Sequence, residues 1–191
     1  FFYMHYAFPR NFKNIFEGHV ATQYMNSQGR PDLGGTEGAR MLGTTSVASY
    51  YGPSFMIDDL TYHYQEADHQ TVLINCHYPI DANSFVLQYG IIVKKSDSLP
   101  GDAALQTAIG LGDFVKMGFL QDVEIWKNKT RIANPLLCDE DGPVYQLRRW
   151  YDQFYVDVAD IRPEMVQRFE FEIDTAKAVE AWQAELVGSM S

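Results

Sequence analysis

QTVLINCHYPIDANSFVLQYGIIVKK is the sequence of residues 70–95, and this stretch decides the fold class of the chain. Gln70 to Tyr78 and Ser84 to Lys95 are rich in Val, Ile, Leu, Phe and Tyr, which favour β-strands. Residues 79–83 form a link between them that is short enough for a hairpin. The stretch therefore predicts two antiparallel strands of a sheet.

Further strands are predicted on both sides of this hairpin. His19 to Met25 alternates well enough for a strand, and the Gly and Pro residues at positions 29–35 predict a long loop after it. Arg168 to Ile173 alternates strictly between apolar and charged residues, which is typical of a strand with one face in water.

Three helices are predicted in the second half of the chain. The first runs from about Asp113 to Lys129 and brings Phe119, Asp122 and Trp126 onto one face. The second begins at Pro143, because proline is favoured in a first helical turn. Its apolar residues recur at helical spacing, and we expect them to pack in the core: Val144, Leu147, Tyr151, Phe154 and Val158.

The last helix begins near Asp174 or Thr175, since either side chain can cap it. It carries Ala178, Trp182 and Leu186 on one side, and we expect it to pack across the sheet. Together these elements predict a single α+β domain over residues 1–191, built as a curled antiparallel sheet with the C-terminal helix across it.

Composition excludes several classes of protein. The net charge of −10 argues against a nucleic-acid partner, because such binding depends on neutralising phosphates with Lys and Arg. Two cysteines in a chain of this size fit a reducing cytoplasm. Apolar stretches fall short of the roughly 20 residues that cross a bilayer, so we expect a soluble, cytoplasmic protein without a membrane span.

Common catalytic motifs are missing from the sequence. It contains neither Gly-x-Ser-x-Gly nor a Gly-rich phosphate loop ending in Lys-Ser/Thr, and no Gly-x-Gly-x-x-Gly fingerprint. Its five histidines include no His-Glu-x-x-His pattern, which argues against a zinc protease. A metal site would have to use ligands dispersed along the chain.

Four polar residues are candidates for a site, each with an ordinary alternative. His5, within an aromatic run, is more often a hydrogen-bonded structural residue than a ligand. Asp122 shares a face with two aromatic side chains, where a carboxylate needs a cation, a metal ion or a hydrogen-bond donor to compensate it. The ordinary alternative is that it pairs with a nearby Lys or Arg or lies at the edge of the face, in solvent. Gln23 and Asn75 are either edge-exposed polar residues or polar groups of an apolar ligand cavity.

Six segments of the sequence resemble the catalytic domain of a known enzyme family. They are HYAFP at 5–9, FEGHVATQY at 16–24, LINCHYP at 73–79, LQYGIIVKK at 87–95, FLQDVEIWKNK at 119–129 and GPVYQLRRWY at 142–151. The chain is similar over nearly its whole length to Rieske-type non-haem iron oxygenases, in particular to the oxygenase components of 3-ketosteroid 9α-hydroxylase. The resemblance implies a helix-grip, START-like domain.

The resemblance also implies the site residues. His5 and Asp122 match a histidine and an aspartate that hold a mononuclear Fe(II) ion and serve catalysis in the family, while Phe119, Trp126, Gln23 and Asn75 would contact the steroid. The family's other histidine ligand falls just before Phe1. We therefore expect this chain to begin inside its domain, to lack that ligand and the upstream Rieske domain, and to be inactive alone.

The resemblance implies a reaction and its partners as well. The intact protein would hydroxylate a 3-ketosteroid at C9 with O2 in steroid catabolism, as a homotrimer. Electrons would pass from NADH through the FAD of a flavin and iron–sulfur reductase to a [2Fe–2S] Rieske cluster. A departure from the family pattern is Asp58, where relatives carry Asn, and the extra charge could alter the substrate range. The alternative function is a non-catalytic steroid- or lipid-binding module, because the same fold also serves as a carrier.

Overall fold

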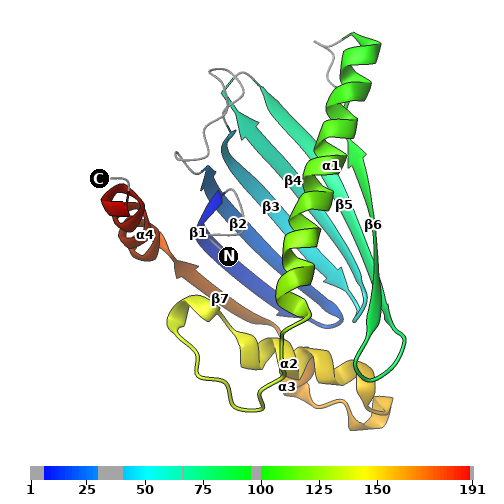
Figure 1. Cartoon of the computed structure of the whole chain (residues 1–191). Helices are drawn as coiled ribbons and strands as arrows, with labels where there is room; N and C mark the ends of the chain where they lie inside the picture. Colours follow the sequence, from blue (N-terminus) through cyan, green and yellow to red (C-terminus); the bar gives the residue numbers. More distant parts are fainter. Residues whose placement is uncertain (1–6, 30–40, 66, 96–99, 190–191) are drawn as a thin grey trace.

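The computed structural model describes residues 7–29, 41–65, 67–95 and 100–189. Within these ranges, six strands come first, a series of helices follows, and a seventh strand and a last helix complete the order (Figure 1). The strands are β1 (Ala7–Glu17), β2 (Val20–Gly29), β3 (Met41–Tyr51), β4 (Phe55–Tyr64), β5 (Asp68–Pro79), β6 (Phe85–Val93) and β7 (Phe169–Asp174). The helices are α1 (Gly101–Trp126), η2 (Asp139–Asp141), α2 (Val144–Asp152), η3 (Gln153–Tyr155), η4 (Val158–Asp160), α3 (Pro163–Val166) and α4 (Ala176–Ser189).

All seven strands form one open antiparallel sheet, so the α+β class is confirmed. Strands β1 to β6 follow one another as a meander, and β7 returns to pair with β1 in the order β6-β5-β4-β3-β2-β1-β7. The predicted hairpin is β5 and β6, which pair from Thr71 with Val93 to Pro79 with Phe85. The predicted strands near His19 and Arg168 correspond to β2 and β7, whereas β1, β3 and β4 were not individually predicted.

Helix α1 lies across one face of the sheet, over β4 to β6 (Figure 1). It begins twelve residues before the predicted start at Asp113, because the low helix propensity of Gly110 and Gly112 is overridden by packing. A Cβ atom at Gly112 would lie 3.7 Å from Cγ2 of Ile91. Buried side chains beneath the helix form a core with Phe114 and Ile91 around it: Tyr62, Leu73, Leu111 and Val115.

Two contacts between aromatic rings show how α1 lies along β6. The Phe119 ring lies 4.8 Å from that of Tyr89, and the Trp126 ring lies 6.3 Å from that of Phe85, between ring centroids. Later residues of α1 therefore contact earlier residues of β6, so the helix and the strand run in opposite directions. From Gly112 to Trp126 a helix rises about 21 Å, and from Ile91 to Phe85 a strand spans about 20 Å, so the two elements stay in register.

The core stripe predicted for the second helix is confirmed in part. Tyr151 and Phe154 pack against the core around Trp150, whereas Leu147 is 43% exposed and Val158 is 86% exposed. The buried positions are Gln146 and Trp150 of α2 and Gln153 of η3. Trp150 Nε1 and Gln153 Nε2 both donate to the carbonyl oxygen of Gly18 in the β1–β2 turn, at 3.1 Å each. These bonds, together with packing of Trp150 against Phe16, anchor the helix to the β1–β2 hairpin.

The expectation that the C-terminal helix packs across the sheet is not confirmed. Helix α4 contacts β1, and in Figure 1 it lies beside the sheet, whereas α1 takes the position across it. Asp174 Oδ1 accepts a hydrogen bond from the backbone N–H of Ala176, as predicted for a cap. Thr175 is buried instead and donates to the carbonyl oxygens of Pro9 and Arg10. The side chains of Trp182 and Leu186 lie outside the described residues.

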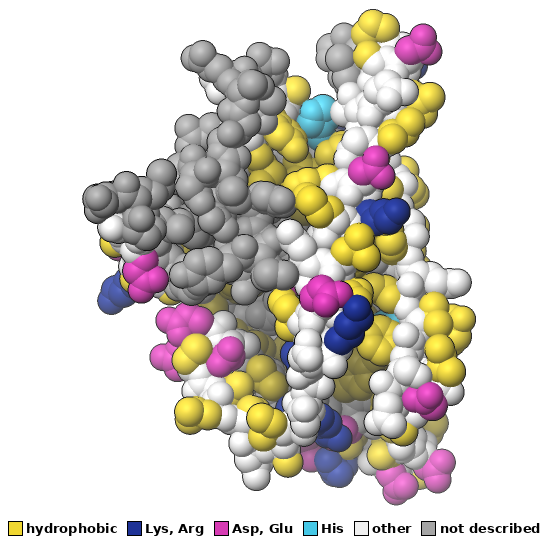
Figure 2. Space-filling model, in the orientation of Figure 1, with side chains coloured by type: hydrophobic (Ala, Val, Ile, Leu, Met, Phe, Trp, Pro, Cys, Tyr) yellow, Lys and Arg dark blue, Asp and Glu magenta, His cyan; other side chains and the backbone are white. Residues whose placement is uncertain are grey.

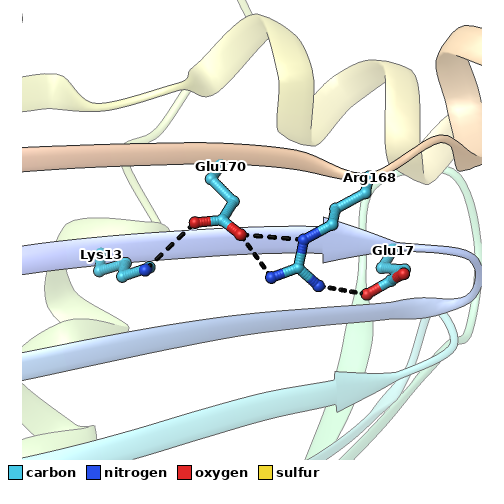
Figure 3. A network of polar contacts seen from close by, with 4 residues as sticks. All are labelled: Lys13, Glu17, Arg168 and Glu170. Atoms are coloured by element: carbon cyan, nitrogen blue, oxygen red, sulfur yellow. Dashed lines mark hydrogen bonds and ion pairs between the residues drawn. The ribbon is translucent and has the colours of Figure 1, made fainter.

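Charged side chains cover the outer β7 edge of the sheet (Figure 3). Lys13 Nζ lies 3.1 Å from Glu170 Oε2, and Arg168 bridges Glu170 to Glu17, with its Nη1 atom 2.5 Å from Glu17 Oε2. Such charges protect an edge strand from pairing with another chain. Among the helices of the described ranges, none is long and apolar enough to span a membrane.

Candidate functional site

The face of the sheet beneath α1 is defined by cross-strand partners. Paired residues of antiparallel strands point to the same side, so each row across the sheet shares one face. Two neighbouring rows run under the helices: Phe16, Ala21, Tyr50, Met56, Asn75 and Tyr89, then Asn14, Gln23, Ala48, Asp58, Leu73 and Ile91. Gln23 and Asn75, predicted from the sequence as candidate polar contacts, therefore lie on the same face. Figure 2 shows hydrophobic side chains on both sides of α1 over this face.

A pocket of about 230 Å³ lies between α1 and the sheet, and we call it the α1 pocket. Its apolar lining comes from both layers: Met25, Met41, Leu60, Tyr62, Leu73, Phe114, Val115, Gly118 and Phe119. Fewer polar residues line the pocket: Ser27, Thr44, Ser46, Asp58, Gln121 and Asp122. A mostly apolar cavity with a few polar groups is the usual form of a small-molecule site.

The polar groups on the floor of the α1 pocket are hydrogen-bonded to one another. Ser27 Oγ lies 2.6 Å from Thr44 Oγ1, and Ser46 Oγ donates to Asp58 Oδ1 at 2.7 Å. Sequence reasoning did not select these hydroxyl groups as site residues. The signal was available, because Thr44, Ser46 and Ala48 are small or polar residues at every second position of β3 and therefore share its inner face.

The floor of this pocket is a poorly solvated environment. Burial raises the pKa of the Asp58 carboxyl group above its ordinary value, and the hydrogen bond from Ser46 opposes this in part. Burial also raises the pKa of the Tyr62 hydroxyl group, and the nearby charges of Asp58 and Tyr64 add to the effect. Both shifts have the same physical cause, which is the cost of placing a charge where water has been excluded.

Asp122 and Phe119 both line the α1 pocket, as the shared helical face predicted. Asp122 is half-buried in the C-terminal half of α1, where its carboxylate is a hard oxygen donor suited to an iron ion. Within the described ranges, no three His, Cys, Asp or Glu side chains are placed to hold a metal ion. His5, the other predicted ligand, lies outside the described residues.

Two buried amide oxygen atoms have no hydrogen-bond partner among the described residues. They are Oδ1 of Asn75, a residue that is 6% exposed, and Oε1 of Gln121, which lines the α1 pocket. An unpaired buried acceptor costs about 1–3 kcal/mol. These two atoms are therefore suited to accept a hydrogen bond from a ligand or from water.

A second pocket of about 370 Å³ lies between α2 and strands β1 to β4, and we call it the α2 pocket. Gln23 lines this pocket and donates from Nε2 to Asn14 Oδ1 at 3.1 Å. Trp126 lines neither pocket and packs against Phe85 instead. The remaining lining is mainly apolar: Phe12, Phe16, Ala21, Thr22, Ala48, Tyr50, Met56, Gly142, Pro143, Val144, Leu147 and Ile173, with Glu140 and Asp141.

The two pockets are neighbours along three strands. Gln23 of the α2 pocket is two residues from Met25 of the α1 pocket on β2, and the same step separates the pockets on β3 and β4. Across the strands, Ala48 of one pocket pairs with Asp58 of the other. The sheet therefore forms one continuous floor, which we call the groove, beneath both helices.

Comparison with known proteins shows the family of this chain. The family model described as the 3-ketosteroid 9α-hydroxylase C-terminal domain matches residues 1–155. A 3-ketosteroid-9-alpha-monooxygenase oxygenase component of Rhodococcus rhodochrous is 61% identical over 193 residues, covering 100% of this chain and 49% of that protein. One of Mycobacterium tuberculosis is 56% identical over 189 residues, covering 97% and 48%. The chain thus spans about half the length of these relatives.

Proposed function

Because the chain belongs to the family of 3-ketosteroid 9α-hydroxylase C-terminal domains, we propose that it is the catalytic domain of a Rieske-type steroid monooxygenase. The whole protein would hydroxylate a 3-ketosteroid at C9 in steroid catabolism. Residues 1–191 would then form a single catalytic domain of the helix-grip type, with α1 as the helix that grips the curled sheet.

The observation that carries this proposal is the α1 pocket. A steroid is a rigid, almost wholly apolar molecule with one or two polar groups at its ends. The pocket offers the matching surface, because its apolar walls meet a carboxylate from α1 and a few hydrogen-bonding groups on the floor. Phe119 forms part of the wall, and Gln23 lines the neighbouring α2 pocket. Asn75 lines neither pocket but lies on the same face of the sheet, and both amides would supply polar contacts.

The donor chemistry of the site fits an iron ion. Asp122 would provide a carboxylate oxygen and His5 an imidazole nitrogen, which are the ligand types of mononuclear non-haem iron sites. Such an ion supplies the binding and activation of O2. The residues of this chain would orient the steroid: Phe119 through the apolar wall, and Trp126 by packing on Phe85 to fix the end of α1.

The remaining parts of the proposal follow from the family. The whole protein would be a cytoplasmic homotrimer that carries a [2Fe–2S] Rieske cluster outside these residues. A separate reductase would deliver electrons from NADH through FAD. The relatives bear the name oxygenase component, which supports the existence of such a partner.

Iron binding tests the proposed site. Anaerobic equilibrium dialysis against Fe(II), followed by metal analysis, should show binding that is lost in Asp122→Ala. Imidazole is added as a further nitrogen ligand, because mononuclear non-haem iron sites of this type use two histidines and one carboxylate. Asp113→Ala is the matched control, since Asp113 is an exposed carboxylate on the same helix and lines neither pocket.

Steroid binding by the same two variants separates the oxygenase from a carrier. Asp122→Ala should still bind androstenedione, because the apolar walls of the pocket are unchanged. The result expected of a carrier is tight steroid binding with no Fe(II) uptake, or with Fe(II) uptake that Asp122→Ala does not reduce. In that case the proposed monooxygenase function would be wrong.

A further inference from the structure

We propose that the α2 pocket holds the side chain of the steroid, and that Val144 and Leu147 on α2 select substrates with a long, uncharged side chain. This inference rests on the proposed function, and it assigns a role in specificity to two residues of a helix that supplies no proposed iron ligand.

The first observation is the apolar surface that α2 turns toward the sheet. Val144 and Leu147 stand at positions where helical periodicity predicts core packing, and both line the α2 pocket. Leu147 nevertheless remains 43% exposed, because the pocket of about 370 Å³ lies between it and the opposite wall. Trp150 and Gln153 hold the helix in place, so Val144 and Leu147 are not needed to anchor it.

The second observation is the length of the groove. On β2 its floor extends from Ala21 in the α2 pocket to Ser27 in the α1 pocket, which corresponds to about 20 Å of extended strand. This length exceeds that of the four fused rings of a steroid. With the rings in the α1 pocket beside Asp122, the α2 pocket is left for whatever extends beyond them.

The third observation concerns the chemistry of the α2 pocket. Phe12, Phe16, Ala21 and Ile173 form an apolar wall opposite Leu147, which suits an alkyl chain. Glu140 and Asp141 also line the pocket, and both are exposed carboxylates. They would repel a side chain that ends in a carboxylate or phosphate. The substrates selected are therefore 3-ketosteroids with a neutral alkyl chain.

Equilibrium dialysis with radiolabelled steroids measures this selection. The probes are androstenedione, which lacks a side chain, progesterone, which has a short one, and cholestenone, which has a long one. Each methylene group buried in the pocket should strengthen binding about fourfold. We therefore expect cholestenone to bind more than about tenfold more tightly than androstenedione.

Leu147→Trp tests the position of the side chain, because the indole would fill the α2 pocket. Its affinity for cholestenone should fall at least about tenfold while its affinity for androstenedione stays unchanged. Leu136→Trp is the matched control, since Leu136 is fully exposed and lines neither pocket. The control should bind all three steroids like the unmodified chain.

Other outcomes overturn the inference in distinguishable ways. If Leu147→Trp weakens all three steroids equally, the α2 pocket holds the ring system. If the unmodified chain binds no steroid, the proposed function fails and the inference fails with it. Should circular dichroism show that Leu147→Trp does not fold, Leu147→Ala replaces it. That variant should lose affinity for cholestenone alone, and equal affinities in it and the unmodified chain would contradict the inference.

Discussion

At the residue scale, Asp58 shows how a buried carboxyl group can make stability depend on pH. It is 9% exposed, and its hydrogen bond from Ser46 does not fully offset the loss of water. Its pKa is therefore raised above the ordinary value of 3.8, so the folded chain holds this proton more tightly than the unfolded chain. Stability conferred by this proton is complete at low pH and is lost as the pH rises through the raised pKa.

Asp58→Asn should therefore stabilise the chain at neutral pH. The amide carries no charge and its oxygen can still accept from Ser46. Urea unfolding followed by circular dichroism should give a higher free energy of unfolding for the variant at pH 7, and the difference should shrink toward pH 4. Asp113→Asn is the control, because Asp113 is an exposed carboxylate on α1, away from Asp58, and lines neither pocket. A difference that does not change with pH would show that packing, rather than ionisation, distinguishes the variant.

At the element scale, α2 is positioned by the anchors Trp150 and Gln153 together with part of its apolar stripe. Trp150 is completely buried, its ring lies 5.0 Å from that of Phe154, and its N–H group donates to Gly18 O in the β1–β2 turn. Gly18 has a positive φ of 56°, as a tight turn between two strands requires. The anchor therefore connects the helix to the hairpin whose strands line the α2 pocket.

Two substitutions at Trp150 should separate packing from hydrogen bonding. Trp150→Ala should lower the free energy of unfolding by about 3–5 kcal/mol, because it leaves a large cavity. Trp150→Phe keeps an aromatic ring and loses one donor, while Gly18 O still accepts from Gln153, so we expect a loss of about 1 kcal/mol. Chemical denaturation measures both. Equal losses for the two variants would mean that the N–H group, rather than the ring, holds the helix.

At the scale of the whole molecule, the sheet separates two surfaces. Its inner face carries both pockets, and its outer face at the β7 edge carries the network of Lys13, Glu17, Arg168 and Glu170. Apolar side chains form most of the lining of both pockets. A ligand that fills this groove should therefore stabilise the folded chain as a whole.

Thermal unfolding should show this stabilisation. A steroid that binds only the folded chain adds about 2.7 kcal/mol to the free energy of unfolding when its concentration is one hundred times its Kd. The unfolding temperature of the chain should therefore rise continuously with androstenedione concentration. Asp122→Ala should show the same rise, because the iron ligand is not part of the apolar wall. A constant unfolding temperature would argue against a steroid site on this face.

The sequence by itself was enough for the local features of this protein. The β5–β6 hairpin, β7 and the shared face of Phe119 and Asp122 follow from alternation and helical spacing, which are properties of neighbouring residues. Family membership was also predicted from local segments, and the family model matches residues 1–155. Periodicity reports which residues share a face, but it does not report what lies opposite that face.

Only the tertiary structure decided what each face meets. The helix across the sheet is α1, and its Gly112 packs near Ile91 of β6. Leu147 faces an open pocket, whereas Gln153 is buried, since a carbonyl group contributed by a turn more than one hundred residues earlier in the sequence satisfies its amide. Asp58 lines the α1 pocket beside Ser46 of the neighbouring strand β3, which donates a hydrogen bond to it. Each outcome depends on contacts between distant segments, which local residue patterns do not encode.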